Sequence, residues 1–112
     1  MGIIQPPLVN KMKNKKLFLD DIRNPKTEGW TIVRNYDEFI NHINLYGLPE
    51  ELSFDHDLGE GQKTGYDCAK WLCDYCWGNG LPIPEYNVHS ANPVGRDNIV
   101  SILQNFEKKL NY

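Results

Sequence analysis

Hydrophobic residues along this chain fall into two patterns, short runs and longer helical repeats. The short runs are rich in Leu, Ile, Val and aromatic side chains and are followed by turn residues, as buried strands are. We expect these strands at residues 16–20, 30–34, 51–55 and 86–90. In three longer segments apolar residues recur three or four positions apart, which is typical of amphipathic helices. We expect these helices at residues 36–46, 65–77 and 95–110. Because helices separate most of the strands, the pattern favours an α/β domain with a mainly parallel sheet.

Two segments between these elements are expected to be loops. Residues 22–29 contain Pro25, and residues 58–64 contain Gly59 and Gly61, all of which interrupt regular structure. If the sheet is parallel, the second of these loops lies at the mouth of the expected pocket.

Polar residues follow three of the four expected strands. Their sequences are Asp20-Asp21, Asp55-His56-Asp57 and His89-Ser90-Ala91-Asn92. The carboxyl ends of parallel strands share one edge of a sheet, and open α/β sheets bind their ligands in the crevice beyond that edge. We therefore expect these side chains to converge on one pocket.

Several carboxylates in one crevice repel one another unless a cation or a proton relieves the repulsion. All-oxygen ligand sets suit hard divalent ions, so the pattern predicts a site for Mg²⁺ or Mn²⁺. We assign Asp20, Asp21 and Asp55 as the first metal ligands and Asp57 as a further candidate. For each aspartate taken alone, the alternative is a turn or helix-cap residue.

His56 and His89 are candidates for proton transfer because histidine titrates near neutral pH. Either could instead be a structural hydrogen-bonding residue. Arginines bind phosphate well, and Arg23 is favoured over Arg34 because Pro25 stiffens the loop after it. The expected phosphate- and substrate-binding residues are Arg23, Thr64, Ser90, Asn92 and Arg96.

At 112 residues the chain fits one small domain, which we place at residues 16–112, with residues 1–15 as an N-terminal extension. A net charge of -3 excludes a protein that coats nucleic acid non-specifically, because such proteins are basic. No apolar run reaches the roughly 20 residues of a membrane-spanning helix. No signal-peptide core is present either, so we expect no membrane association and a cytoplasmic location.

Three cysteines, at positions 68, 73 and 76, are expected to pack on a helix rather than bind metal.

The motifs together resemble a receiver-like family, the cyclic-phosphate processing receiver domain. The segments that carry the resemblance are residues 17–25, 53–59, 64–67 and 89–93. It implies a flavodoxin-like, three-layer α/β sandwich with a reduced four-stranded, mainly parallel sheet in the order 2-1-3-4. The chain also resembles response-regulator receivers. In those domains an acidic pair and a third-strand aspartate hold Mg²⁺, and that aspartate is phosphorylated. Carried over, these positions are Asp20, Asp21 and Asp55, with Ser90 at the hydroxyl position.

The favoured function is metal-dependent hydrolysis of a phosphoester, with a cyclic phosphate on a nucleotide or an RNA end as substrate. In this scheme His56, His89 and Asp55 are the catalytic residues. Two alternatives remain open: a non-catalytic binder that sequesters a cyclic nucleotide or nucleic-acid end, and a receiver phosphorylated on Asp55. The sequence does not fix the preferred base or the oligomeric state.

Overall fold

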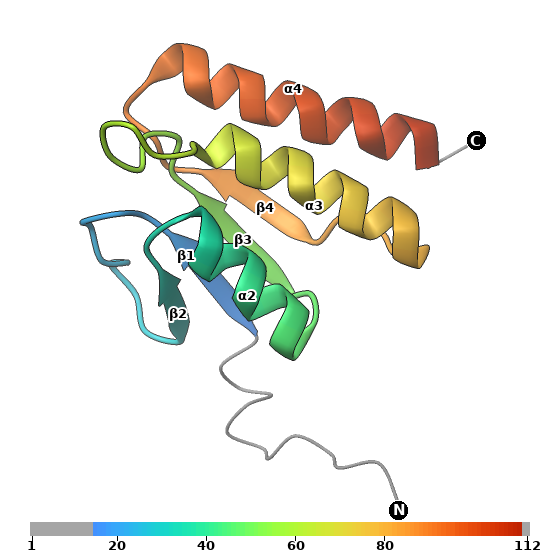
Figure 1. Cartoon of the computed structure of the whole chain (residues 1–112), viewed down its shortest axis with the longest axis horizontal. Coiled ribbons are helices and arrows are strands. Elements are labelled where there is room, and N and C mark those ends of the chain that lie inside the picture. The colour runs from blue at the N-terminus through green and yellow to red at the C-terminus, as the bar shows by residue number, and fades with distance from the viewer. Residues whose placement is uncertain (1–14, 111–112) are drawn as a thin grey trace, which may run out of the picture.

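A computed structural model describes residues 15–110, and the expected extension, residues 1–15, lies outside this range except for Lys15. Within the range, helices and strands alternate after the second strand (Figure 1). The elements are β1 (Lys16–Leu19), β2 (Trp30–Val33), α2 (Tyr36–Tyr46), β3 (Glu51–Phe54), α3 (Gly65–Asn79), β4 (Glu85–Val88) and α4 (Pro93–Leu110).

The four strands form one sheet in the order β2-β1-β3-β4, and every neighbouring pair is parallel. The receiver-like α/β fold and the strand order are therefore confirmed. Each strand ends one or two residues before the expected boundary. After β1 the chain turns because the Asp20 side chain accepts hydrogen bonds from the backbone N–H groups of Ile22 and Arg23.

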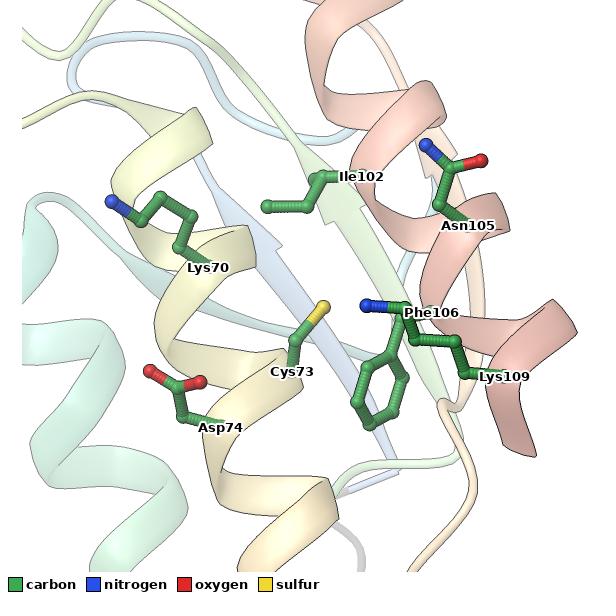
Figure 2. A pocket seen from close by; sticks show the side chains of 7 residues that line it. All are labelled: Lys70, Cys73, Asp74, Ile102, Asn105, Phe106 and Lys109. Atoms are coloured by element: carbon green, nitrogen blue, oxygen red, sulfur yellow. The ribbon is translucent and has the colours of Figure 1, made fainter.

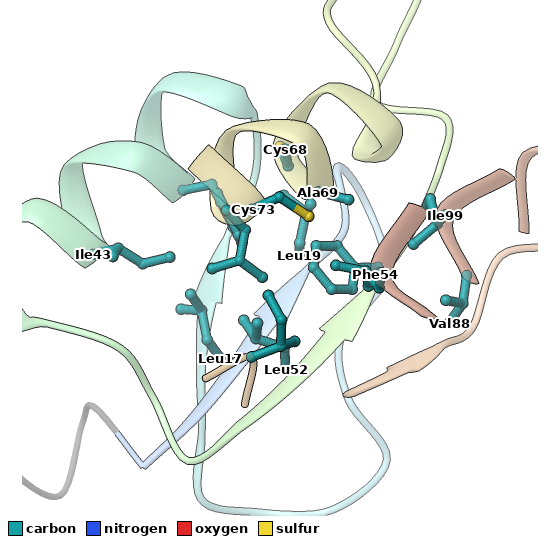
Figure 3. Packing of buried hydrophobic residues seen from close by; sticks show 14 of the residues in the cluster. Leu17, Leu19, Ile43, Leu52, Phe54, Cys68, Ala69, Cys73, Val88 and Ile99 are labelled. Atoms are coloured by element: carbon teal, nitrogen blue, oxygen red, sulfur yellow. The ribbon is translucent and has the colours of Figure 1, made fainter. Parts of the chain in front are cut away.

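The hydrophobic core lies on one face of the sheet (Figure 3). Leu17 and Leu19 of β1 point to this face, as do Leu52 and Phe54 of β3, because alternate strand residues share a face. All three helices contribute to the same cluster. Their core residues include Phe39, Ile43, Leu72, Ile99 and Leu103.

The expected sandwich differs from the structure in its layers. In residues 15–110 the helices α2, α3 and α4 all pack on the Leu17 face, and no helix covers the face to which Phe18 points. The difference arises because residues 20–29, between β1 and β2, form an irregular loop rather than a covering helix. The loop therefore lies beside the Phe18 face in place of a helix, and Phe18, which is 8% exposed, lines a pocket together with loop residues 23–26.

Local hydrogen bonds set the helix boundaries. The Thr64 side chain and Asp67 form a reciprocal capping box that begins α3. The same helix continues to Asn79, beyond the expected residue 77, and ends at Gly80, whose positive φ of 65° favours glycine. Asn92 accepts a hydrogen bond from Gly95 at 3.0 Å. As a result α4 begins at Pro93 rather than at residue 95.

All three cysteines are buried in the core cluster, as the packing interpretation predicted. Burial raises the pKa of the Cys73 and Cys76 thiols to about 11. They therefore stay protonated at neutral pH and act as small apolar residues. Separately, none of the helices in residues 15–110 combines the length and hydrophobicity needed to cross a bilayer.

Candidate active site

Three candidate residues directly follow strands of the sheet: Asp20 after β1, Asp55 after β3 and His89 after β4. Each donates its backbone N–H to the last residue of a neighbouring strand, at 3.1, 2.9 and 2.9 Å respectively. These bonds extend the sheet ladder by one residue. The sheet itself therefore fixes the backbone of all three residues at one edge.

Asp20, Asp21 and Asp55 form an acidic cluster, in which one carboxylate oxygen from each lies within 4.8 Å of the others. Asp20 is fully buried, and Asp55 is 4% exposed. Burial pushes the pKa of Asp20 upward, but the backbone N–H groups of Arg23 and Ile22 oppose it. Together with His89 and the charge of Arg23, they hold the pKa of Asp20 below its usual value. Asp20 is therefore ionised at neutral pH.

Asp55 behaves in the opposite way. Burial and then the negative charge of Asp20 raise the pKa of Asp55, although the His56 N–H and the Arg23 charge act against this rise. Burial and the neighbouring charge of Asp20 thus disfavour a negative charge on Asp55. Three close carboxylate oxygens are a donor set that suits a hard divalent cation, whose charge would offset this repulsion. The residues present fit Mg²⁺ or Mn²⁺.

We expect Asp55→Asn to increase the free energy of unfolding of the metal-free protein at neutral pH. The folded state disfavours ionised Asp55, so the wild type carries this cost at pH values above the raised pKa. Below the ordinary aspartate pKa the carboxyl is protonated in both states, and the cost disappears. The advantage of the variant should therefore shrink as the pH falls.

Urea unfolding in the presence of a chelator, at several pH values, measures this difference. Asp57→Asn is the matched control, because Asp57 is exposed and its pKa is lowered by the hydrogen bond with His56. This control should show no gain at neutral pH. An equal gain for Asp55→Asn at acid and neutral pH would contradict the assigned repulsion.

His89 links the acidic cluster to the open face of the sheet. Its Nε2 lies 3.0 Å from Asp20 Oδ2, and its Nδ1 lies 2.6 Å from Ser53 Oγ. Ser53 donates its hydroxyl proton to Asn87 Oδ1 at 2.7 Å, so the hydroxyl oxygen is left to accept from Nδ1–H of His89. The imidazole also stacks on Phe18, with ring centroids 4.4 Å apart and planes 4° apart. These contacts hold the ring with Nε2 toward the cluster.

Two arginines shape the other side of the cluster. Arg23 is half exposed and lies 3.1 Å from Asp20 through Nε and 3.6 Å from Asp55 through Nη2. Arg34 holds the loop that carries Arg23. It donates to the carbonyl oxygens of Asp20 and Arg23 at 3.1 and 2.8 Å, and to the side chain of Asn24 at 2.7 Å. Arg23 is therefore the arginine beside the carboxylates, and Arg34 positions it.

His56, Asp57 and Asn92 form a second group. His56 Nδ1 lies 3.0 Å from Asp57 Oδ1, and Asn92 donates to the other oxygen of Asp57 at 3.3 Å. Asp57 is exposed and is not part of the cluster of three carboxylates. Gly95, in the first turn of α4, lies so close to the His56 ring that an added Cβ would come within 2.3 Å of it. A glycine at this position therefore allows α4 to cover His56.

The remaining predicted residues have partners outside the acidic cluster. Thr64 is engaged with Asp67 in the α3 cap. Ser90 accepts from the backbone N–H of Asn92 at 3.1 Å. Arg96 is exposed and lines a separate surface pocket of about 440 Å³ together with Ser90.

Sequence reasoning missed Phe18, Ser53 and Asn87, which hold the His89 ring. Each lies inside a strand, where the sequence pattern indicated only a structural role. The available signal was strand alternation. Asn87 is two residues before His89 and shares its face, and Ser53 on β3 is the register partner of Asn87. Buried serine at 4% exposure also indicates a hydrogen-bonding role.

Two pockets differ in their relation to this site. One, of about 350 Å³, is lined by Arg23 and His89, and so adjoins the acidic cluster. The other, of about 370 Å³, lies between α3 and α4, around Cys73 and Phe106 (Figure 2). None of the candidate site residues lines the second pocket.

Comparison with known proteins gives one family match. No curated protein and no solved structure matches the chain. A family model described as the cyclic-phosphate processing receiver domain matches residues 15–105, a span that contains all seven strands and helices except the end of α4. The chain belongs to the cyclic-phosphate processing receiver domain family.

Proposed function

We propose that this domain is a metal-dependent phosphoesterase that opens a cyclic phosphate on a nucleotide or an RNA end. One observation carries the proposal: the carboxylate of Asp20 belongs to the acidic cluster and also contacts His89 and Arg23. A cation site, a proton-transfer group and a phosphate-binding charge thus share one buried residue.

Asp20, Asp21 and Asp55 would hold Mg²⁺ or Mn²⁺. When bound, such an ion stabilises negative charge on phosphoryl oxygens and orients a water molecule. Arg23 contributes a second positive charge beside the cluster. Its half-exposed guanidinium is accessible to a non-bridging phosphate oxygen.

The histidines transfer the protons of the reaction. Water attacks phosphorus, one ring P–O bond breaks, and the product is a phosphate monoester with a free hydroxyl group. His89, whose Nε2 faces the cluster, would exchange a proton with the reacting oxygens. His56, next to Asp55 and held by Asp57, is our candidate for the second proton transfer.

The competing functions use the same residues. A non-catalytic binder would need Arg23 and the histidines but no turnover, and a receiver would be phosphorylated on Asp55. Incubating the protein with a panel of ribonucleoside cyclic phosphates and Mg²⁺, and then recovering the ligand by chromatography, separates these functions. Ring-opened product supports the proposal. Intact ligand recovered from a tight complex would support the binder. In a separate incubation with beryllofluoride or a small phosphodonor, an adduct on Asp55 would support the receiver.

We expect Ser53→Ala to lower kcat by roughly 10-fold with little change in KM. The substitution removes the hydroxyl that fixes His89 Nδ1, so the ring samples other orientations. Steady-state kinetics measure the effect, and Ser53→Thr should restore much of kcat because it retains the hydroxyl. Ser101→Ala, on the exposed side of α4, is the control and should match the wild type. An unchanged kcat for Ser53→Ala would contradict the positioning role.

A further inference from the structure

The pocket beside the acidic cluster lies at the open face of the sheet. It has a volume of about 350 Å³ and will be called the loop pocket; it is lined by Phe18, Arg23, Asn24, Pro25, Lys26 and His89. Four of these residues come from the loop between β1 and β2, on the face that no helix of residues 15–110 covers. Its volume is at the small end for ligand pockets, which suits one nucleoside-sized group rather than an extended strand.

The chemistry of the loop pocket is aromatic and basic. Phe18 and His89 both line the pocket, with their rings stacked face to face, and the rigid ring of Pro25 belongs to the loop beside them. Arg23 and Lys26 contribute positive charges, and among residues 15–110 no carboxylate lines the pocket. Asn24 Oδ1 already accepts from Arg34 at 2.7 Å, so the amide of Asn24 offers hydrogen-bond donors to a ligand.

The loop pocket and the acidic cluster share two residues. Arg23 contacts Asp20 and Asp55, and His89 contacts Asp20, while both side chains also line the pocket. A ligand whose phosphate lies at the cluster therefore places its adjoining group in the loop pocket.

We propose that the loop pocket binds the base of the nucleotide whose phosphate is processed at the acidic cluster. Heteroaromatic bases stack on aromatic side chains, and their carbonyl and ring-nitrogen acceptors match arginine, lysine and asparagine donors. The inference rests on the proposed function for the placement of the phosphate. It extends that function by assigning the residues that recognise the base of the nucleotide.

Binding of the full chain to two probes tests this assignment. One probe is a set of ribonucleoside cyclic phosphates, and the other is glycerol cyclic phosphate, which has the reactive ring but no base. Each probe is titrated in the presence of Mg²⁺ and followed by proton–nitrogen correlation NMR. We expect the nucleotides to bind about 10- to 100-fold more tightly than glycerol cyclic phosphate. The nucleotide-specific shifts should be largest at residues 23–26.

The Lys26→Glu variant sharpens the test, because Lys26 is exposed and its substitution leaves the core intact. This variant should lose most of the nucleotide preference, whereas Lys70→Glu, which changes a lysine of the separate pocket between α3 and α4, should retain it. Equal affinity for the two probes, no nucleotide binding, or equal behaviour of the two variants would overturn the base pocket. Base-dependent binding without ring opening would support the pocket and overturn hydrolysis. If both probes bind equally tightly and both rings are opened, hydrolysis is supported and the base pocket is overturned.

Discussion

Asp20→Asn is expected to lower the rate of cyclic-phosphate opening by about 1,000-fold, because this one carboxylate serves three parts of the site. It supplies one oxygen to the acidic cluster, and it contacts His89 Nε2 and Arg23 Nε at 3.0 and 3.1 Å. An amide in its place has no charge for a cation or for Arg23. Steady-state kinetics with saturating Mg²⁺ measure the loss.

The same substitution should leave the domain folded. Asparagine keeps an oxygen that can accept from the backbone N–H groups of Ile22 and Arg23, the bonds that turn the chain after β1. It also removes the repulsion between Asp20 and Asp55. We expect the free energy of unfolding to change by less than about 2 kcal/mol, measured in urea. Asp74→Asn, in the pocket between α3 and α4, should retain full activity. Wild-type activity of Asp20→Asn would refute the proposed site.

His89→Ala is expected to lower kcat by about 100- to 10,000-fold, the range for loss of a general acid or base. The imidazole is the group that faces the acidic cluster from β4, and Ser53 and Phe18 fix its orientation. Unlike Asp20→Asn, this variant keeps all three carboxylates of the cluster.

Comparing metal affinity with turnover separates the two variants. Calorimetric titration with Mn²⁺ should give His89→Ala an affinity close to that of the wild type, whereas Asp20→Asn should bind much more weakly. Unchanged kcat in His89→Ala would limit His89 to a structural role.

The position of Asp20, Asp55 and His89 could be predicted from sequence because it depends only on strand ends. Each residue directly follows a short apolar run, and parallel strands bring such residues to one edge whatever the loops do. The strand order and the family resemblance followed from the same motifs. The burial of Leu19 and Phe54 could be predicted in the same way, because both belong to short apolar runs that are typical of buried strands.

The rest depends on loop paths and caps, which spacing does not determine. Asp57 lies three residues after its strand and Asp21 lies two residues after its own, yet only Asp21 reaches the acidic cluster, while Asp57 contacts His56 and Asn92. Thr64 caps α3 because Asp67 is available three residues later, a local bond that competes with ligand binding.

The open face of the sheet was unexpected for a related reason. A three-layer sandwich needs a helix between β1 and β2, and residues 20–29 instead form a loop fixed by Arg34. That loop, with Phe18 and His89, creates the pocket next to the cluster. The absence of a covering helix between β1 and β2 is thus also the reason that the loop pocket can form next to the acidic cluster.

The central claim is that the acidic cluster and His89 act together on a cyclic phosphate in a metal-dependent reaction. Phosphorus NMR of ribonucleoside cyclic phosphates mixed with the wild-type chain tests it most directly, with Mg²⁺, with Mn²⁺ and with excess chelator. We expect the cyclic-phosphate resonance to be replaced by a monoester resonance when either metal is present, and to persist with chelator. A cyclic-phosphate signal that stays unchanged with both metals, or that disappears equally fast with chelator, would contradict the account.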